Sequence, residues 1–179
     1  DVADGRVLIG YLAPPADDPD YPAVRVLTEI LGGGRGSRLS SALAEEGKSA
    51  AGVAGAFFPL RLEQGRVVVY ATPKRIDETI ALMTEVVDDL RSAAVTSEEL
   101  KRAKNRIVGH YVMRGQSNLE RARRLAWDEL SGLGDGAHER LIGSVEDVGA
   151  DDVLAVAASY LVDPVIVVLR PGRSGRGGI

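Results

Sequence analysis

The chain has 179 residues, of which 45% are hydrophobic and 27% charged, and its formal net charge is −4. This size and balance are typical of one folded domain, and the acidic charge argues against nucleic acid as a partner. Cysteine is absent, which excludes disulfides, thiolate metal sites and cysteine nucleophiles. No run approaches the roughly 20 apolar residues of a membrane-spanning helix, so we expect no membrane partner.

The first part of the chain alternates strands and helices. Residues 6–13 are rich in β-forming side chains and end at two prolines, which predicts a strand closed by a stiff turn. A helix with one apolar face follows and stops at the glycines 32–34. A short helix is predicted over 37–46. The stretches 50–58 and 66–72 then read as two strands of a hairpin.

Helices dominate the next part. Apolar residues recur every three or four positions over 76–90, which predicts an amphipathic helix. Thr96 and Glu99 have the spacing of a capping box and open a long helix. Ser117 repeats this device at the start of another helix.

The end of the chain completes one expected domain over residues 1–170. A helix over 150–161 precedes an apolar run at 164–170, which we interpret as a buried strand, and the glycine- and arginine-rich residues 171–179 predict a flexible tail. The first and last strands can flank the hairpin with mixed pairing. The expected fold is α+β, a two-layer α/β sandwich with a mostly antiparallel sheet and helices on one face. Because the first residue is Asp1 rather than Met, we expect a fragment of a longer chain.

The segment GGGRGSRL at 32–39 is the strongest candidate for a ligand loop. Glycines before a helix can bind an anion through backbone amides, and Arg35 and Arg38 would add positive charge. However, the Gly-Lys-Ser/Thr ending of a nucleotide loop is missing, and Leu39 stands where a dinucleotide fingerprint needs its third glycine. We favour a structural turn and keep an anion-binding module as the weaker alternative.

Catalytic residue patterns are absent. The two histidines, His110 and His138, lack a partner at the helical spacing of a zinc motif, so we expect no metal site and no cofactor in this chain. The sequence has no Gly-x-Ser-x-Gly elbow of a serine hydrolase. Its paired acids are adjacent in sequence, so on a helix they point about 100° apart and do not form a catalytic dyad. We expect Trp127, the one tryptophan, to be a core or rim anchor.

Several short motifs occur in an order that resembles one family. They are Tyr11-Leu12-Ala13-Pro14, Asp20-Tyr21-Pro22-Ala23, Ile30-Leu31-Gly32-Gly33 with Gly36-Ser37-Arg38-Leu39, Thr96 to Leu100 with Arg102-Ala103-Lys104-Asn105, and Ser117-Asn118. Together they resemble the pitrilysin/insulinase family of zinc metallopeptidases, which includes mitochondrial processing peptidase. The resemblance runs from Val7 to Leu169.

The resemblance implies a unit that works with another. Family members combine units of this size around a chamber for unfolded peptide, and the first unit binds zinc through a His-x-x-Glu-His helix. The equivalent helix here, 37–46, has no histidine, so the chain looks like the zinc-free, C-terminal "inactive" type of unit. The implied partners are a zinc-bearing domain or subunit and unfolded peptide. A homo-oligomer of this chain is also possible. Bacterial members occur in cytoplasm and periplasm, and the compartment is unknown.

The resemblance also implies where this unit departs from active relatives. Their second unit supplies an arginine and a tyrosine that bind the scissile carbonyl, and these positions align with Ala44 and Ala50. Alanine cannot donate a hydrogen bond to an oxyanion, and losing one such donor costs about 10²–10³-fold in rate. The function expected is therefore a non-catalytic unit of the peptide chamber, and the alternative is a catalytically dead scaffold homologue.

Overall fold

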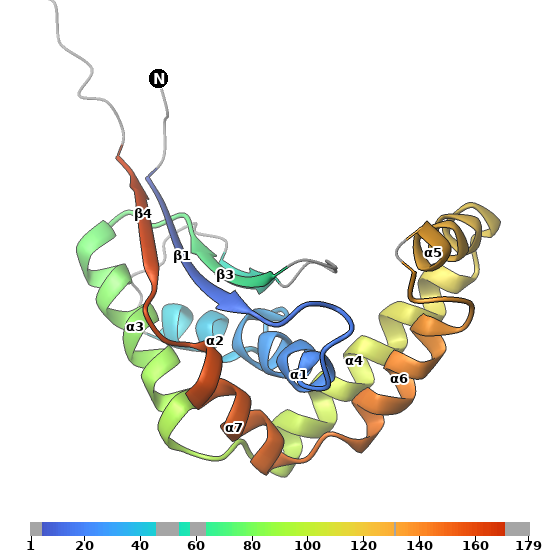
Figure 1. Ribbon diagram of the computed structural model, residues 1–179. Coiled ribbons are helices and arrows are strands. Elements are labelled where there is room, and N and C mark those ends of the chain that lie inside the picture. Colours follow the sequence, from blue (N-terminus) through green and yellow to red (C-terminus); the bar gives the residue numbers. More distant parts are fainter. Residues whose placement is uncertain (1–4, 46–53, 58–63, 131, 171–179) are drawn as a thin grey trace, which may run out of the picture.

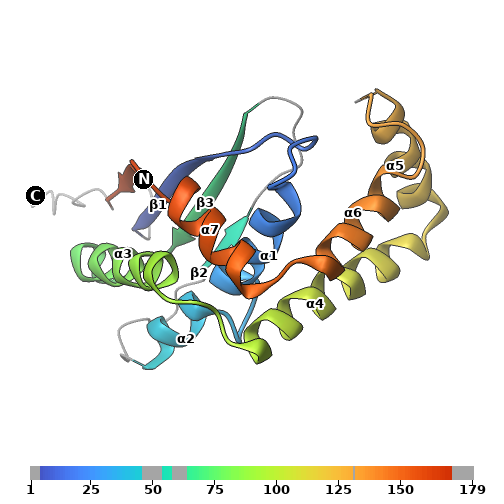
Figure 2. The same ribbon diagram turned by 60° about the horizontal axis from the view of Figure 1, so that its bottom comes forward.

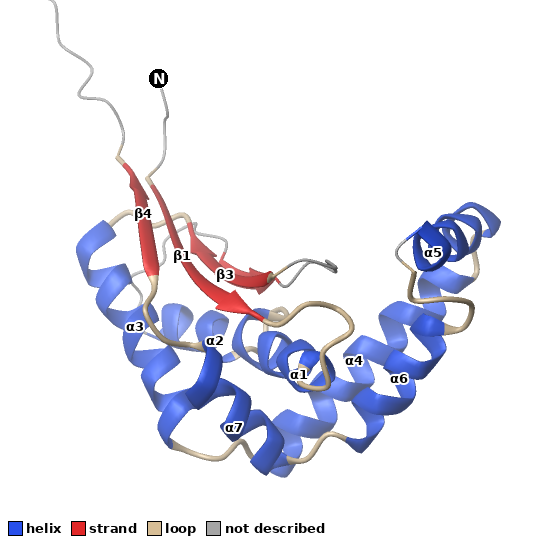
Figure 3. Ribbon diagram, in the orientation of Figure 1, coloured by secondary structure: helices blue, strands red, loops and turns tan. Residues whose placement is uncertain are grey.

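The computed structural model describes residues 5–45, 54–57, 64–130 and 132–170. Across these residues the predicted α+β class is confirmed, because four antiparallel strands form one sheet and helices cover one of its faces (Figures 1 and 3). The elements in chain order are β1 (Arg6–Ala13), α1 (Tyr21–Gly32), α2 (Arg38–Glu45), β2 (Ala54–Phe57), β3 (Gly65–Ala71), α3 (Ile76–Ser92), α4 (Ser97–Gly115), α5 (Asn118–Leu130), α6 (Ala137–Asp147), α7 (Ala150–Tyr160) and β4 (Val165–Leu169).

The strand order is β2-β3-β1-β4, and each neighbouring pair is antiparallel. β2 and β3 pair as predicted, but the first and last strands do not lie on either side of them. Instead β1 pairs with both β3 and β4, so that Val7 lies opposite Ala71 on one side and Val168 on the other. The expected mixed pairing is wrong for the described strands, because the last strand returns antiparallel beside the first.

The core lies between the sheet and the helices beneath it. Alternate residues of β1 and β3 point to the helices, and Ile9 and Val69 are at most 1% exposed. Helical stripes complete the core, with Leu27 of α1 and Met83 of α3 both at 0% exposure. Each such side chain contributes about 1.5–3 kcal/mol through burial. The local apolar periodicities that predicted these elements are therefore the ones that form the core.

Three helices extend away from this two-layer body. α4 and α6 run side by side and carry α5 beyond the sheet (Figures 1 and 2). α6 is a correction to the sequence analysis, which predicted no helix over 137–147. This helix forms because Val145 is fully buried and Leu141 packs against the core, contacts that exist only once α4 and α1 are in place.

The last strand is a second correction. The apolar run at 164–170 was expected to be buried, but β4 is an edge strand. Val165 is 67% exposed and Val167 is 54% exposed. Sequence hydrophobicity indicates a strand of this kind but does not reveal whether another element covers it.

Candidate functional site

The helix α2 positions the first of the two predicted substrate-binding residues. Leu39 and Leu43 face the core at 0% and 5% exposure, so Ala44, the next residue, lies on the exposed side. Its predicted companion, Ala50, lies outside the described residues, and the pairing of the two positions stays a prediction. An exposed methyl group at residue 44 offers neither charge nor a hydrogen bond to a peptide carbonyl.

The glycine-rich turn between α1 and α2 is packed against α4. Gly34 has φ +124°, and a Cβ atom there would come within 2.3 Å of Arg106 Nη1. Arg106 also forms an ion pair with Glu29 of α1. Burial raises the pKa of Glu29, and the nearby Arg106 opposes that rise. Gly34 therefore permits a close contact between the turn and the Arg106 side chain of α4, which favours the structural interpretation of this turn.

Arg38, a predicted anion contact, pairs with a carboxylate. Its Nε and Nη2 atoms donate to the two oxygens of Glu99 at 2.8 and 3.2 Å. Hydrogen bonding from Arg38 lowers the pKa of Glu99 to about 2 despite partial burial, and the capping contacts of Thr96 add to this effect. Glu29 and Glu99 both line the adjacent cavity of about 40 Å³. Arg102 and Arg106 line the same cavity, so each carboxylate there is matched by an arginine and the cavity has no surplus positive charge to hold an anion. Arg35, the other predicted anion contact, is exposed and does not line this cavity.

The sheet face turned away from the helices is largely apolar. We call it the open face, and the pleat and register assign to it the side chains of Arg6, Leu8, Leu12, Arg66, Val68, Tyr70, Val165, Val167 and Leu169. Leu12 is 64% exposed and Leu169 is 43% exposed. Gly10 lies between Val68 and Val165 in the register, so the middle of this face is flat. The described helices contact the sheet from its other side (Figure 3).

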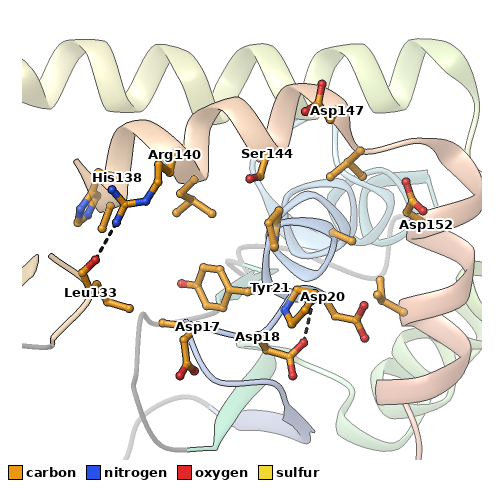
Figure 4. Close-up of a pocket in the computed structure, with 18 of the residues that line it drawn as sticks. Asp17, Asp18, Asp20, Tyr21, Leu133, His138, Arg140, Ser144, Asp147 and Asp152 are labelled. Atoms are coloured by element: carbon orange, nitrogen blue, oxygen red, sulfur yellow. Dashed lines mark hydrogen bonds between the residues drawn. The ribbon is translucent and has the colours of Figure 1, made fainter. Parts of the chain in front are cut away.

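A cavity of about 670 Å³ lies between the β1–α1 loop, α6 and α7. Figure 4 shows the Tyr21 ring between α6 and the loop that carries Asp17 and Asp18. Asp147 and Asp152 also line the cavity, together with Ala137, His138, Arg140 and Leu141. This cavity was not predicted, because no helix was expected over 137–147. The spacing of Leu141, Val145 and Val148 is the signal that could have found it.

Most polar groups around this cavity hold the structure together. Asp20 accepts a hydrogen bond from the Tyr160 hydroxyl at 3.0 Å, and Asp152 accepts one from the Gly149 amide at 2.8 Å. Arg140 donates to two backbone carbonyl groups, those of Leu133 and Asp135. These groups cap helices and hold loops, and they do not form an acid–base pair around a reacting atom.

The described part of the chain does not fit a zinc site. No three His, Cys, Asp or Glu side chains among these residues are grouped to hold a metal ion. His110 is exposed on α4, and His138 Nδ1 lies 2.7 Å from the Asp128 carboxylate. None of the helices described is long and apolar enough to span a membrane. Fold and site together define an α+β unit whose described residues include no cluster of metal ligands.

Comparison with known families identifies the unit further. Residues 1–107 match the family described as the peptidase M16 inactive domain. Because this match covers more than half of the chain, the chain belongs to the M16 peptidase family, and the predicted family resemblance is confirmed. The description as an inactive domain agrees with the expected zinc-free type of unit. A comparison with curated proteins gave no match.

Solved structures share the fold. A protease from Helicobacter pylori has a TM-score of 0.83 and 21% identity, with 95% of this chain covering 42% of that one. A peptidase M16 inactive domain from Pseudomonas fluorescens has a TM-score of 0.80 and 24% identity, with coverages of 93% and 40%. An inactive peptidase domain from Bordetella parapertussis has a TM-score of 0.82 and 21% identity, with coverages of 98% and 97%. This chain thus spans less than half of the first two relatives.

Proposed function

We propose that this chain is a non-catalytic unit that forms one wall of a peptide-binding chamber, opposite a zinc-bearing domain or subunit. The observation that carries the proposal is the open face of the sheet. Its exposed apolar side chains include Leu12 at 64% and Val165 at 67% exposure. Exposed apolar side chains gathered on one face are a feature of interaction sites in soluble proteins.

The chemistry of the open face suits an unfolded peptide. Such a peptide presents apolar side chains in varied order. A surface that binds it therefore obtains its binding free energy from the apolar area it buries rather than from a fixed set of hydrogen bonds. The flat centre at Gly10 lets a peptide backbone approach the sheet, and Arg6 and Arg66 add positive charge at the margins. These features support sequence-tolerant binding.

The catalytic step is assigned to a companion. The M16 relative from Helicobacter pylori is called a protease, and its chain is more than twice as long as the segment that matches here. This length supports a companion domain of similar size. The described residues of the present unit lack a zinc-binding cluster, and Ala44 cannot bind the scissile carbonyl. In the assembly, zinc would activate water within the companion, and this unit would hold the peptide.

The experiment pairs this chain with a zinc-bearing M16 unit from the same source and follows cleavage of an unfolded reporter peptide. Glutamate in place of Leu12 and Val167 should raise KM about 10-fold, because it places charge on the apolar face. Ala81→Glu, an exposed site on α3, is the control and should leave KM unchanged. Unchanged KM in the open-face variant, with zinc content equal, would count against the chamber role.

Two alternative functions predict different results, the first in this cleavage experiment and the second in a phosphate-binding measurement. A catalytically dead scaffold, which the exposed alanine at 44 favours, would assemble with its partner without supporting cleavage. An anion-binding module would bind inorganic phosphate through Arg35 and Arg38. The ion pair between Arg38 and Glu99 makes this third function the weakest of the three.

A further inference from the structure

The helix α5 is attached to its neighbours through its polar side. The Arg124 guanidinium lies 4.5 Å from the centre of the Tyr111 ring and 3.7 Å from Glu139. One turn further on, Asp128 is 1% exposed and lies 2.7 Å from His138. Two residues four positions apart are therefore anchored to α4 and α6. We call α4 and α6 together the arm. These contacts determine which side of α5 faces away from the arm.

The outward side of α5 is apolar. Leu119, Ala122, Ala126 and Leu130 follow at spacings of three or four residues, and all four are exposed. Leu119 is 61% exposed and Leu130 is 85% exposed. We call these four residues the α5 stripe. An amphipathic helix normally packs its apolar stripe against the core. In α5 the polar side packs against α4 and α6, and the apolar stripe is exposed instead.

The α5 stripe is symmetric about its own centre. Two leucines stand at its ends, and two alanines stand between them. If a second α5 helix packs antiparallel, Leu119 of one copy lies against Leu130 of the other. The alanines then meet at the crossing point, where small side chains allow helix axes to approach within about 8–10 Å. The antiparallel arrangement also places opposite helix dipole ends together.

The margins of the stripe fit the same pairing. Trp127 is 44% exposed, and Arg123, with 69% of its side chain exposed, lies one turn before it on the same margin. In the antiparallel register, Arg123 of one copy comes opposite Trp127 of the other. A guanidinium over an indole ring is worth about 0.5–1 kcal/mol at an exposed site.

We propose that the α5 stripe is a self-association surface, on which a second copy of this chain packs its own α5 helix antiparallel. This contact does not rest on the chamber role, because it lies on the arm and not on the open face. A 13-residue helix is about 20 Å long, so the buried area is small and the association weak. We expect a dissociation constant of about 10–500 µM.

The lone tryptophan reports the association directly. Trp127 is the one tryptophan of the chain, so its emission should shift to shorter wavelength as the chain is concentrated through this range. Sedimentation should show a monomer–dimer equilibrium over the same concentrations. Replacing Leu119 and Leu130 with serine should weaken association at least about 10-fold. Leu12→Ser, which alters a similarly exposed leucine on the sheet, is the matched control and should leave the dissociation constant of self-association unchanged.

Cross-linking tests the register. The chain has no cysteine, so single cysteines can be introduced without background. A disulfide should form between a Leu119→Cys chain and a Leu130→Cys chain and should not form between two Leu119→Cys chains. Antiparallel packing keeps identical ends about 16 Å apart, far beyond the roughly 4 Å between Cβ atoms in a disulfide.

Three outcomes would overturn the proposal. The chain could remain monomeric up to millimolar concentration with no change in Trp127 emission. Leu12→Ser could weaken association as much as the stripe variant, which would place the contact on the open face. The emission shift could occur only with anionic phospholipid vesicles, in which case α5 would be a membrane-surface helix.

Discussion

The contact between Arg38 and Glu99 offers a quantitative test of how the glycine-rich turn is held. It joins the start of α2 to the start of α4, which are 61 residues apart in the chain. Replacing Glu99 with glutamine removes the charge but keeps a side chain that suits a capping box with Thr96. The substitution therefore isolates the ion pair from the cap.

The expected magnitude follows from the pKa of Glu99, which falls from the ordinary 4.5 to about 2. A tenfold change in proton affinity is worth about 1.4 kcal/mol, so the upper limit is about 3 kcal/mol. The two side chains keep 22% and 17% of their surface exposed. Because water weakens such a pair, we expect about 1–2 kcal/mol. The folded pKa is depressed, so this stability is complete above about pH 5 and is lost as the pH falls through about 2.

The assay is urea unfolding followed by circular dichroism for the parent chain, Arg38→Gln, Glu99→Gln and the double variant. The cycle should give a coupling energy of about 1–2 kcal/mol at pH 7, which isolates the pair from other effects. Between pH 5 and pH 2 the parent should lose more stability than Glu99→Gln. A coupling below about 0.3 kcal/mol at pH 7, or equal pH slopes for these two proteins, would refute the reasoning.

Three further predictions concern the site and the core. Introducing Ala44→Arg and Ala50→Tyr together should raise cleavage by an assembly with a zinc-bearing partner about 10-fold or more, and no gain would argue against their assignment as the lost carbonyl contacts. Gly34→Ala should lower the free energy of unfolding by about 2 kcal/mol because φ is +124°, whereas Gly36→Ala, where a Cβ atom meets only ordinary contacts, should change urea unfolding little. Met83→Ala should lower the free energy of unfolding by about 2–5 kcal/mol because Met83 is fully buried, and a smaller loss in calorimetry would contradict that packing.

Much of the fold was predictable because its signals are local. The strand expected over 6–13 is confirmed as β1, and the periodic stretch from residue 76 forms α3. The capping box of Thr96 and Glu99 is present with both of its hydrogen bonds. Each of these signals depends on residues within one or two turns of each other, so the sequence displays them directly.

Other features depend on contacts between distant segments. The helix α6 was missed because its apolar residues are few and are buried only against α1 and α4. The exposure of β4 was missed because a continuous apolar run is typical of a strand buried on both faces, whereas this run forms an edge strand. The cavity beside Tyr21 was not predicted because α6, which forms part of its wall, was not predicted.

Residue identities alone show that the chain has no cysteine and that its two histidines lack partners at helical spacing, which argues against a zinc motif carried on one helix. The sequence also places alanine at residues 44 and 50, since residue identity needs no coordinates. Which apolar groups face outward depends instead on how the helices and strands pack together. Burial of Asp128 beside His138 orients α5 so that its leucines face outward, and such an orientation depends on packing between helices.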